Sequence, residues 1–100
     1  MDISDWRARI DEIDEKLIEL FNQRARIALE IGRIKKELGV PVFNPDREDF
    51  IYDHVQRNNP GPLSNAAIRR LFERIIDETR RLERELTEQE GMGDGHQHGA

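Results

Sequence analysis

The stretch "IDEIDEKLIELFNQRARIALEIGRIKKELG", residues 10–39, decides the fold of this 100-residue chain. Its apolar residues recur in steps of three and four, which is the spacing of one face of an α-helix. We therefore expect a long amphipathic helix, whose apolar stripe consists of Ile10, Ile13, Leu17, Leu20, Ile27, Ile31, Ile34 and Leu38.

The expected bounds of this helix follow from the residues around it. From about Ser4 to Leu38 there is no proline, and Gly32 is the one glycine. Ser4 or Asp5 can cap the start, and Gly39 followed by a proline is a stop signal. About 35 residues of helix form a rod about 50 Å long.

Such a rod is too long for a compact chain of this size, for which the radius of gyration is near 13 Å. We expect an all-α homodimer, in which two long helices pair and each chain's shorter helices cover the partner as well as itself.

Two shorter helices and a tail complete the expected domain, residues 1–90. Asn44 and Pro45 are typical of a helix start, and this second helix should end near Arg57. After the turn-rich "NNPGPLSN", Ser64 can cap a third helix over about 65–88. The last ten residues, "GMGDGHQHGA" (91–100), have no apolar pattern, and we expect them to be disordered.

Composition excludes several functions. A net charge of -5 argues against general nucleic-acid binding, which needs a basic face. No apolar stretch approaches the roughly 20 residues that span a bilayer, and the N-terminus is acidic where a signal peptide is basic. The chain has no cysteine, which fits a reducing compartment. We expect a cytoplasmic protein.

Polar residues interrupt the apolar stripes. Arg24 occupies a stripe position between Leu20 and Ile27, and a guanidinium buried there without a partner would cost several kcal/mol. Lys35 lies three turns further along almost the same face. Two cations therefore point into one side of the bundle.

The other two helices carry matching polar groups. In the third helix, Thr79 interrupts the stripe and Glu83 lies one turn away on the same face. In the second, Arg47 and Glu48 fall in the first turn, beside Asn44. Together these residues predict a cationic pocket, with a few hydrogen-bonding groups, for a small polyanion.

A structural interpretation competes with this one. A lone arginine at a stripe position often sets helix register or forms a salt bridge between subunits, and Lys35 could be a surface lysine. We see no catalytic Ser-His-acid arrangement, glycine-rich phosphate loop or bundle metal site. An enzyme of this composition would act through positioning and electrostatics, with no metal or cofactor.

Two stretches carry a resemblance to a known family. "IDEIDEKLIELFNQRARIALEIGRIKKELGVPVFNPDRE" and "IRRLFERIIDETRRLE" resemble the all-helical (AroQ) class of chorismate mutases, over roughly residues 5–88. The "NNPGPLSN" connection is similar to the versions fused to, or working beside, the DAHP synthase that opens the shikimate pathway. The resemblance implies an intertwined all-α dimer that rearranges chorismate to prephenate on the way to phenylalanine and tyrosine.

The resemblance also implies roles for individual residues. Arg24 and Arg47 would bind substrate carboxylates, with Arg7 reaching in from the partner chain. Lys35 would donate to the ether oxygen and to a carboxylate, and Glu48 would accept from the substrate hydroxyl. The remaining expected substrate-binding positions are Thr79, usually a small hydroxyl residue, Glu83, which is Gln or Glu in the family, and Asn44, where many relatives have Asp.

Two other functions stay open at this point. An isochorismate-pyruvate lyase of the same fold acts on a closely related dianion, and the set of Lys35, Arg47, Glu48 and Glu83 favours the mutase over it. The second is a non-enzymatic helical dimerisation or regulatory module, in which Arg24 would be structural.

Overall fold

The computed structural model describes the backbone of residues 1–99 and the side chains of residues 1–89. This part of the chain forms three helices: α1 (Ile3–Leu38), α2 (Pro45–Arg57) and α3 (Asn65–Gly99). The expected all-α fold with a long first helix is confirmed. The backbone of α3 extends beyond the end predicted near residue 88. The tail predicted at 91–100 lies outside the residues whose side chains are described, and it stays a prediction.

The cap of α1 differs from the prediction. Asp2, not Ser4 or Asp5, is the N-cap residue. Its Oδ1 accepts from the backbone N–H of Asp5 at 3.1 Å, and Oδ2 of Asp5 accepts from the N–H of Asp2 at 3.1 Å. Asp5 therefore acts as the second half of a capping box, because a reciprocal pair satisfies two free N–H groups at once.

The other helix boundaries follow the sequence signals. Gly39 ends α1 in the left-handed conformation, with φ 70°, which glycine adopts without a steric penalty. Oδ1 of Asn44 caps α2 by accepting from the N–H of Arg47 at 3.1 Å. Oγ of Ser64 accepts from the N–H of Ala67 at 3.0 Å at the start of α3. All three boundaries are confirmed.

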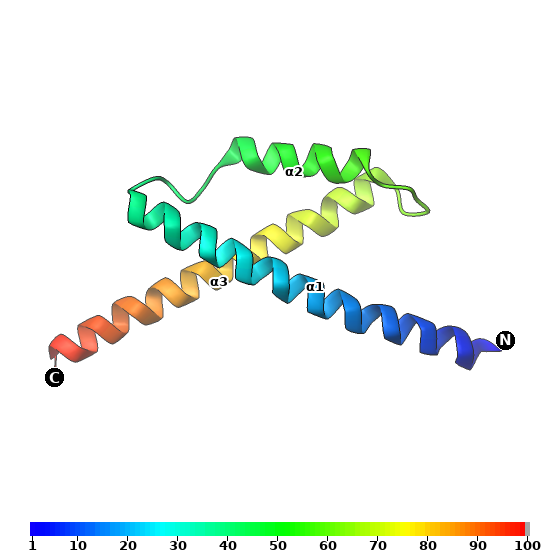
Figure 1. Ribbon diagram of the computed structural model, residues 1–100, viewed down its shortest axis with the longest axis horizontal. Helices are drawn as coiled ribbons and strands as arrows, with labels where there is room; N and C mark the ends of the chain where they lie inside the picture. Colours follow the sequence, from blue (N-terminus) through cyan, green and yellow to red (C-terminus); the bar gives the residue numbers. More distant parts are fainter. Residues whose placement is uncertain (100) are drawn as a thin grey trace.

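The three helices form an open arrangement (Figure 1). The C-terminal half of α1 crosses the middle of α3, and α2 lies along the N-terminal half of α3. The N-terminal half of α1 extends away from both. None of the described helices contains an apolar run long enough to cross a membrane.

A single chain of this shape has almost no core. The radius of gyration is 18.1 Å, compared with about 13 Å for a compact chain of this length. Ile76, which is 7% exposed, is the one buried apolar residue among those described. In the first half of α1 the stripe remains 40% to 59% exposed at Ile10, Ile13, Leu17 and Leu20.

Candidate active site

Two adjoining cavities lie where α1 crosses α3, beneath the segment that leads into α2. Their volumes are about 390 Å³ and about 300 Å³. Seven of the eight predicted site residues line one or both of them, and the eighth, Arg7, lines neither. The seven are Arg24, Lys35, Asn44, Arg47, Glu48, Thr79 and Glu83.

Arg24 is the half-buried cation of this site. It lines both cavities, and within the described part of the chain it forms no ion pair or hydrogen bond through its side chain. Burial lowers the pKa of its guanidinium, and the nearby positive charge of Arg47 lowers it further. The protein therefore holds two like charges near each other, neither of them in an ion pair with a described residue, which favours binding of an external anion.

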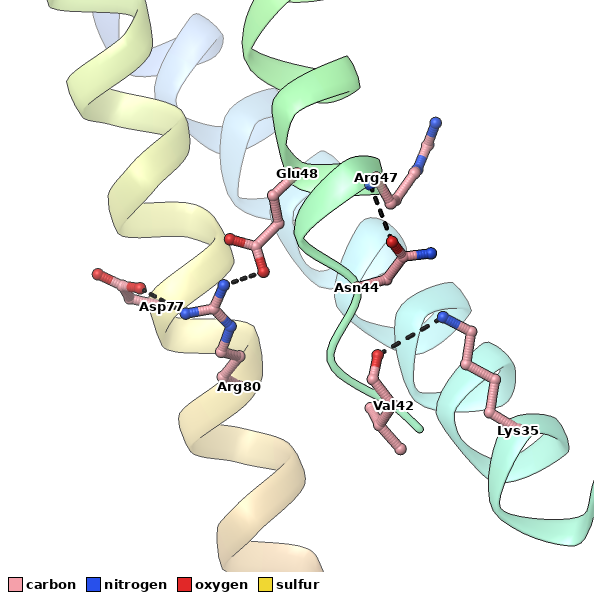
Figure 2. A network of polar contacts seen from close by, with 7 residues as sticks. All are labelled: Lys35, Val42, Asn44, Arg47, Glu48, Asp77 and Arg80. Atoms are coloured by element: carbon pink, nitrogen blue, oxygen red, sulfur yellow. Dashed lines mark hydrogen bonds and ion pairs between the residues drawn. The ribbon is translucent and has the colours of Figure 1, made fainter. Parts of the chain in front are cut away.

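Lys35 of α1 and Asn44, the N-cap residue of α2, lie on the same side of the segment that leads into α2 (Figure 2). Nζ of Lys35 donates to the carbonyl oxygen of Val42 at 3.5 Å, a long bond that leaves its other protons available. Oδ1 of Asn44 is occupied by the helix cap. Its Nδ2 can still donate to a ligand.

Arg47 lies at the start of α2 and extends away from Glu48 in Figure 2. Its guanidinium carbon is 5.0 Å from the centre of the Phe50 ring, which is a cation–π contact. It lines both cavities and has no carboxylate partner among the described residues. Together with Arg24 and Lys35 it gives one cavity three cations that form no ion pair with any described residue.

Glu83 supplies an acidic group on the α3 side of both cavities. Burial raises its pKa, while Lys35 and Arg80 lower it by a smaller amount. A carboxyl group with a raised pKa keeps its proton to higher pH, so that it can donate a hydrogen bond.

Thr79 lies one turn before Glu83 and lines the smaller cavity. Its hydroxyl donates to the carbonyl oxygen of Ile75 at 2.9 Å. The hydroxyl proton is therefore used within the helix, and the oxygen can accept from a ligand. This explains why the hydroxyl is tolerated in the apolar stripe of α3.

Arg80 was missed by the sequence analysis. It lines the smaller cavity, and its Nη2 donates to Oε2 of Glu48, joining α3 to α2 (Figure 2). In the sequence, Asp77 offers Arg80 a partner at i−3 on the same helix, which is the usual sign of a solvated surface pair. No local signal indicated the cross-helix partner.

Arg7 is not part of this site within one chain. It is exposed on the N-terminal half of α1, the part that extends away from the other two helices (Figure 1). Any role for Arg7 in the site requires a second chain.

The lining of the site is suited to binding an anion. Its lining combines arginine, lysine, carboxyl, amide and hydroxyl groups on an apolar floor of Ile27, Ile31 and Ile51. Within the described residues no group of three potential metal ligands comes together. The arrangement can hold a small dianion and place one carboxyl group and one ammonium group against it.

Comparisons with known proteins agree with this geometry. The profile of the family described as chorismate mutase type II matches residues 6–84. A chorismate mutase from Methanocaldococcus jannaschii is 30% identical over 89 residues, covering 87% of this chain and 89% of that protein. A solved structure of chorismate mutase from Thermus thermophilus (form II) superimposes with a TM-score of 0.80 and 34% identity, covering 82% of this chain and 93% of that one.

A longer relative is also similar. The bifunctional chorismate mutase/prephenate dehydratase of Pseudomonas aeruginosa is 44% identical over 85 residues, which are 80% of this chain. This chain spans 23% of the length of that protein. The similarity therefore concerns one part of a larger relative.

Proposed function

Because this chain belongs to the chorismate mutase type II family, we propose that it catalyses the rearrangement of chorismate to prephenate, a step toward phenylalanine and tyrosine. The observation that carries this proposal is the cavity of about 390 Å³ lined by Arg24, Lys35 and Arg47, none of which has an ion-pair partner among the described residues. A dianionic substrate supplies the missing negative charges.

The reaction suits such a site. In this Claisen-type rearrangement the ether C–O bond breaks as a new C–C bond forms within one molecule, and no proton moves in that step. The protein has to hold the chair-like conformer and stabilise the charge that develops on the ether oxygen. Neither task needs a nucleophile, a metal or a cofactor.

The three cations have two roles, which are substrate binding and stabilisation of the developing charge. Arg24 and Arg47 bind the two carboxylates, which fixes the substrate between α1 and α2. Lys35 donates to the ether oxygen and to a carboxylate. A preorganised donor of this kind is worth several kcal/mol in the transition state, because it meets the developing charge without reorganisation.

Glu83 is the second donor to the ether oxygen. It can fill this role when protonated, and burial raises its pKa in the required direction. Glu48 accepts from the substrate hydroxyl, and Thr79 and Asn44 add hydrogen bonds at the rim. Lys35, Glu83 and Arg24 are thus the proposed catalytic residues.

The functional unit in this proposal is a cytoplasmic homodimer. The apolar stripe on the first half of α1 is exposed in the single chain, and pairing with a second α1 would remove it from water. The same pairing would bring Arg7 of one chain toward the cavity of the other. An association with DAHP synthase, which the loop resemblance implies, stays a prediction.

The runner-up is an isochorismate-pyruvate lyase, since its substrate is a dianion of similar shape. A non-enzymatic module is the third candidate. Incubating the purified chain separately with chorismate and with isochorismate, and identifying products by chromatography, decides among them. The proposal requires prephenate from chorismate. Salicylate and pyruvate from isochorismate alone would assign the lyase, and no product from either would assign the module.

A further inference from the structure

The ion pair between Glu48 and Arg80 joins two helices, α2 and α3. The ion pairs of Arg33, Arg57 and Arg74 instead join residues three or four apart on one helix. The pair between Glu48 and Arg80 is also less exposed than these pairs, with 19% of the Glu48 side chain and 39% of the Arg80 side chain accessible. Reduced exposure weakens solvent screening, so this pair is expected to hold its geometry.

Arg80 is held in place by three groups from three segments. Besides Glu48, its Nη1 lies 3.5 Å from Oδ1 of Asp77 on its own helix. Its guanidinium carbon lies 5.1 Å from the centre of the Phe43 ring, in the segment that precedes α2. A planar guanidinium can donate hydrogen bonds to a carboxylate in its plane while its face stacks on an aromatic ring. The ammonium group of a lysine has no such planar face.

The pair determines how Glu48 can act. Arg80 occupies Oε2 of the carboxylate, while Oε1 accepts no hydrogen bond from any described residue. Both residues line the smaller cavity. One oxygen of Glu48 is therefore fixed by the protein and the other remains available to a ligand.

The pair also affects the charge that a dianion meets. An unpaired carboxylate in the cavity wall would repel the substrate, and this repulsion strengthens as water is excluded. A guanidinium bound directly to that carboxylate offsets most of its field. Arg80 thus allows an acidic hydrogen-bond acceptor to lie in an anion site.

We infer that Arg80 is a positioning residue for substrate binding, which orients Glu48 and neutralises its charge so that Oε1 can accept the hydroxyl of the dianionic substrate. This inference rests on the proposed function. It assigns Arg80 an indirect role, because its own guanidinium is already engaged by Glu48, Asp77 and Phe43.

The test is a double-mutant cycle between Arg80→Met and Glu48→Gln, with KM and kcat measured for chorismate. The Arg80→Met variant is expected to raise KM about tenfold and to lower kcat much less, since the lost interaction acts on bound substrate and transition state alike. In the Glu48→Gln background, the same change should alter KM by less than about twofold, because no carboxylate remains to be held.

Arg81→Met is the matched control. Arg81 is the next residue of α3, it pairs with Glu78 and Glu85 on its own helix, and it lines neither site cavity. The substitution removes the same charge and should leave KM unchanged. Equal KM values for Arg80→Met and Arg81→Met would overturn the inference, as would an Arg80→Met effect of the same size with and without Glu48.

If the Arg80→Met variant does not fold, the same KM measurements are made with Arg80→Lys. It retains the charge but not the three-way contact, so KM should lie between those of the wild type and the methionine variant, and this increase should vanish with Glu48→Gln. An increase that persists in that background would contradict the inference. If the wild-type chain converts no chorismate, the proposed function fails; if it does and Arg80 behaves as Arg81, the inference alone fails.

Discussion

Gly32 of α1 lies against the carboxyl group of Glu83 on α3. A Cβ atom placed on Gly32 would be 3.8 Å from both Cδ and Oε1 of Glu83. Gly32 lies where the two helices cross, and the Glu83 side chain is half-buried there. The contact connects the packing of α1 and α3 to the raised pKa of the acid in the site.

This contact predicts the effect of substitutions at Gly32. A distance of 3.8 Å is ordinary van der Waals contact, so a methyl group fits. Gly32→Ala should stabilise the protein by about 0.5–1 kcal/mol, because alanine favours the helix interior over glycine. Urea unfolding and steady-state kinetics measure this, and kcat should remain within about twofold of wild type.

Gly32→Val is the matched comparison for this test. Its branched side chain reaches beyond the methyl position and would displace the Glu83 carboxyl, so it should lower kcat. Equal losses of activity with alanine and with valine would show that the space beside Glu83 is smaller than the structure indicates.

The raised pKa of Glu83 predicts a pH dependence. The protonated acid is the donor, so kcat should fall as pH rises through this pKa, and Glu83→Gln should flatten that loss because an amide donates at every pH. The free energy of unfolding should change in the same direction. The contribution of Glu83 to stability is present at low pH and is lost as pH rises through the raised pKa. A flat wild-type profile, with the same profile in the glutamine variant, would remove Glu83 from this role.

Much of the fold could be predicted because its signals are local. The stripe of α1, the stop at Gly39 and the caps at Asn44 and Ser64 depend on residues within a few positions of each other. The cap at Asp2 was missed because Ser4 and Asp5 are also good capping residues, and the reciprocal pairing of Asp2 with Asp5 decides among them.

The site was predictable where a polar residue interrupts an apolar stripe, as Arg24 and Thr79 do. Arg80 does not interrupt an apolar stripe, so no local pattern marks it. Its partner Glu48 lies 32 positions earlier in the sequence, and the two residues meet only because α2 packs against α3. The predicted role of Arg7 concerns the site of a second chain, so the structure of one chain cannot test it.

The exposed stripe of α1 predicts what breaks the proposed dimer. Ile13→Asp should shift the protein toward monomers and abolish activity, because it places a charge in the paired apolar surface. Asn22→Asp is the matched control, since it adds the same charge about 180° around the helix. Light scattering coupled to size-exclusion chromatography measures the mass. A dimeric Ile13→Asp protein would exclude this face as the interface.

The proposed sharing of sites between chains predicts that two inactive variants complement each other. In a mixed dimer of Arg7→Ala and Arg24→Ala chains, one site receives both arginines and the other neither. Co-refolded mixtures should recover about a quarter of the wild-type activity, since half the dimers are mixed and each has one intact site. Activity no greater than that of the separate variants would indicate that Arg7 and Arg24 do not act from different chains.

The central claim is that Arg24 is half-buried in order to bind a substrate carboxylate. The most direct test compares kcat/KM for chorismate, followed by loss of its ultraviolet absorbance, between Arg24→Ala, the wild type and Arg33→Ala. Arg33 is an exposed arginine of the same helix that pairs with Glu30 and Glu37. We predict that Arg24→Ala lowers kcat/KM by more than about a hundredfold in a protein that remains dimeric, and that Arg33→Ala leaves it unchanged. An Arg24→Ala dimer that retains wild-type activity would contradict the claim and make Arg24 a structural residue.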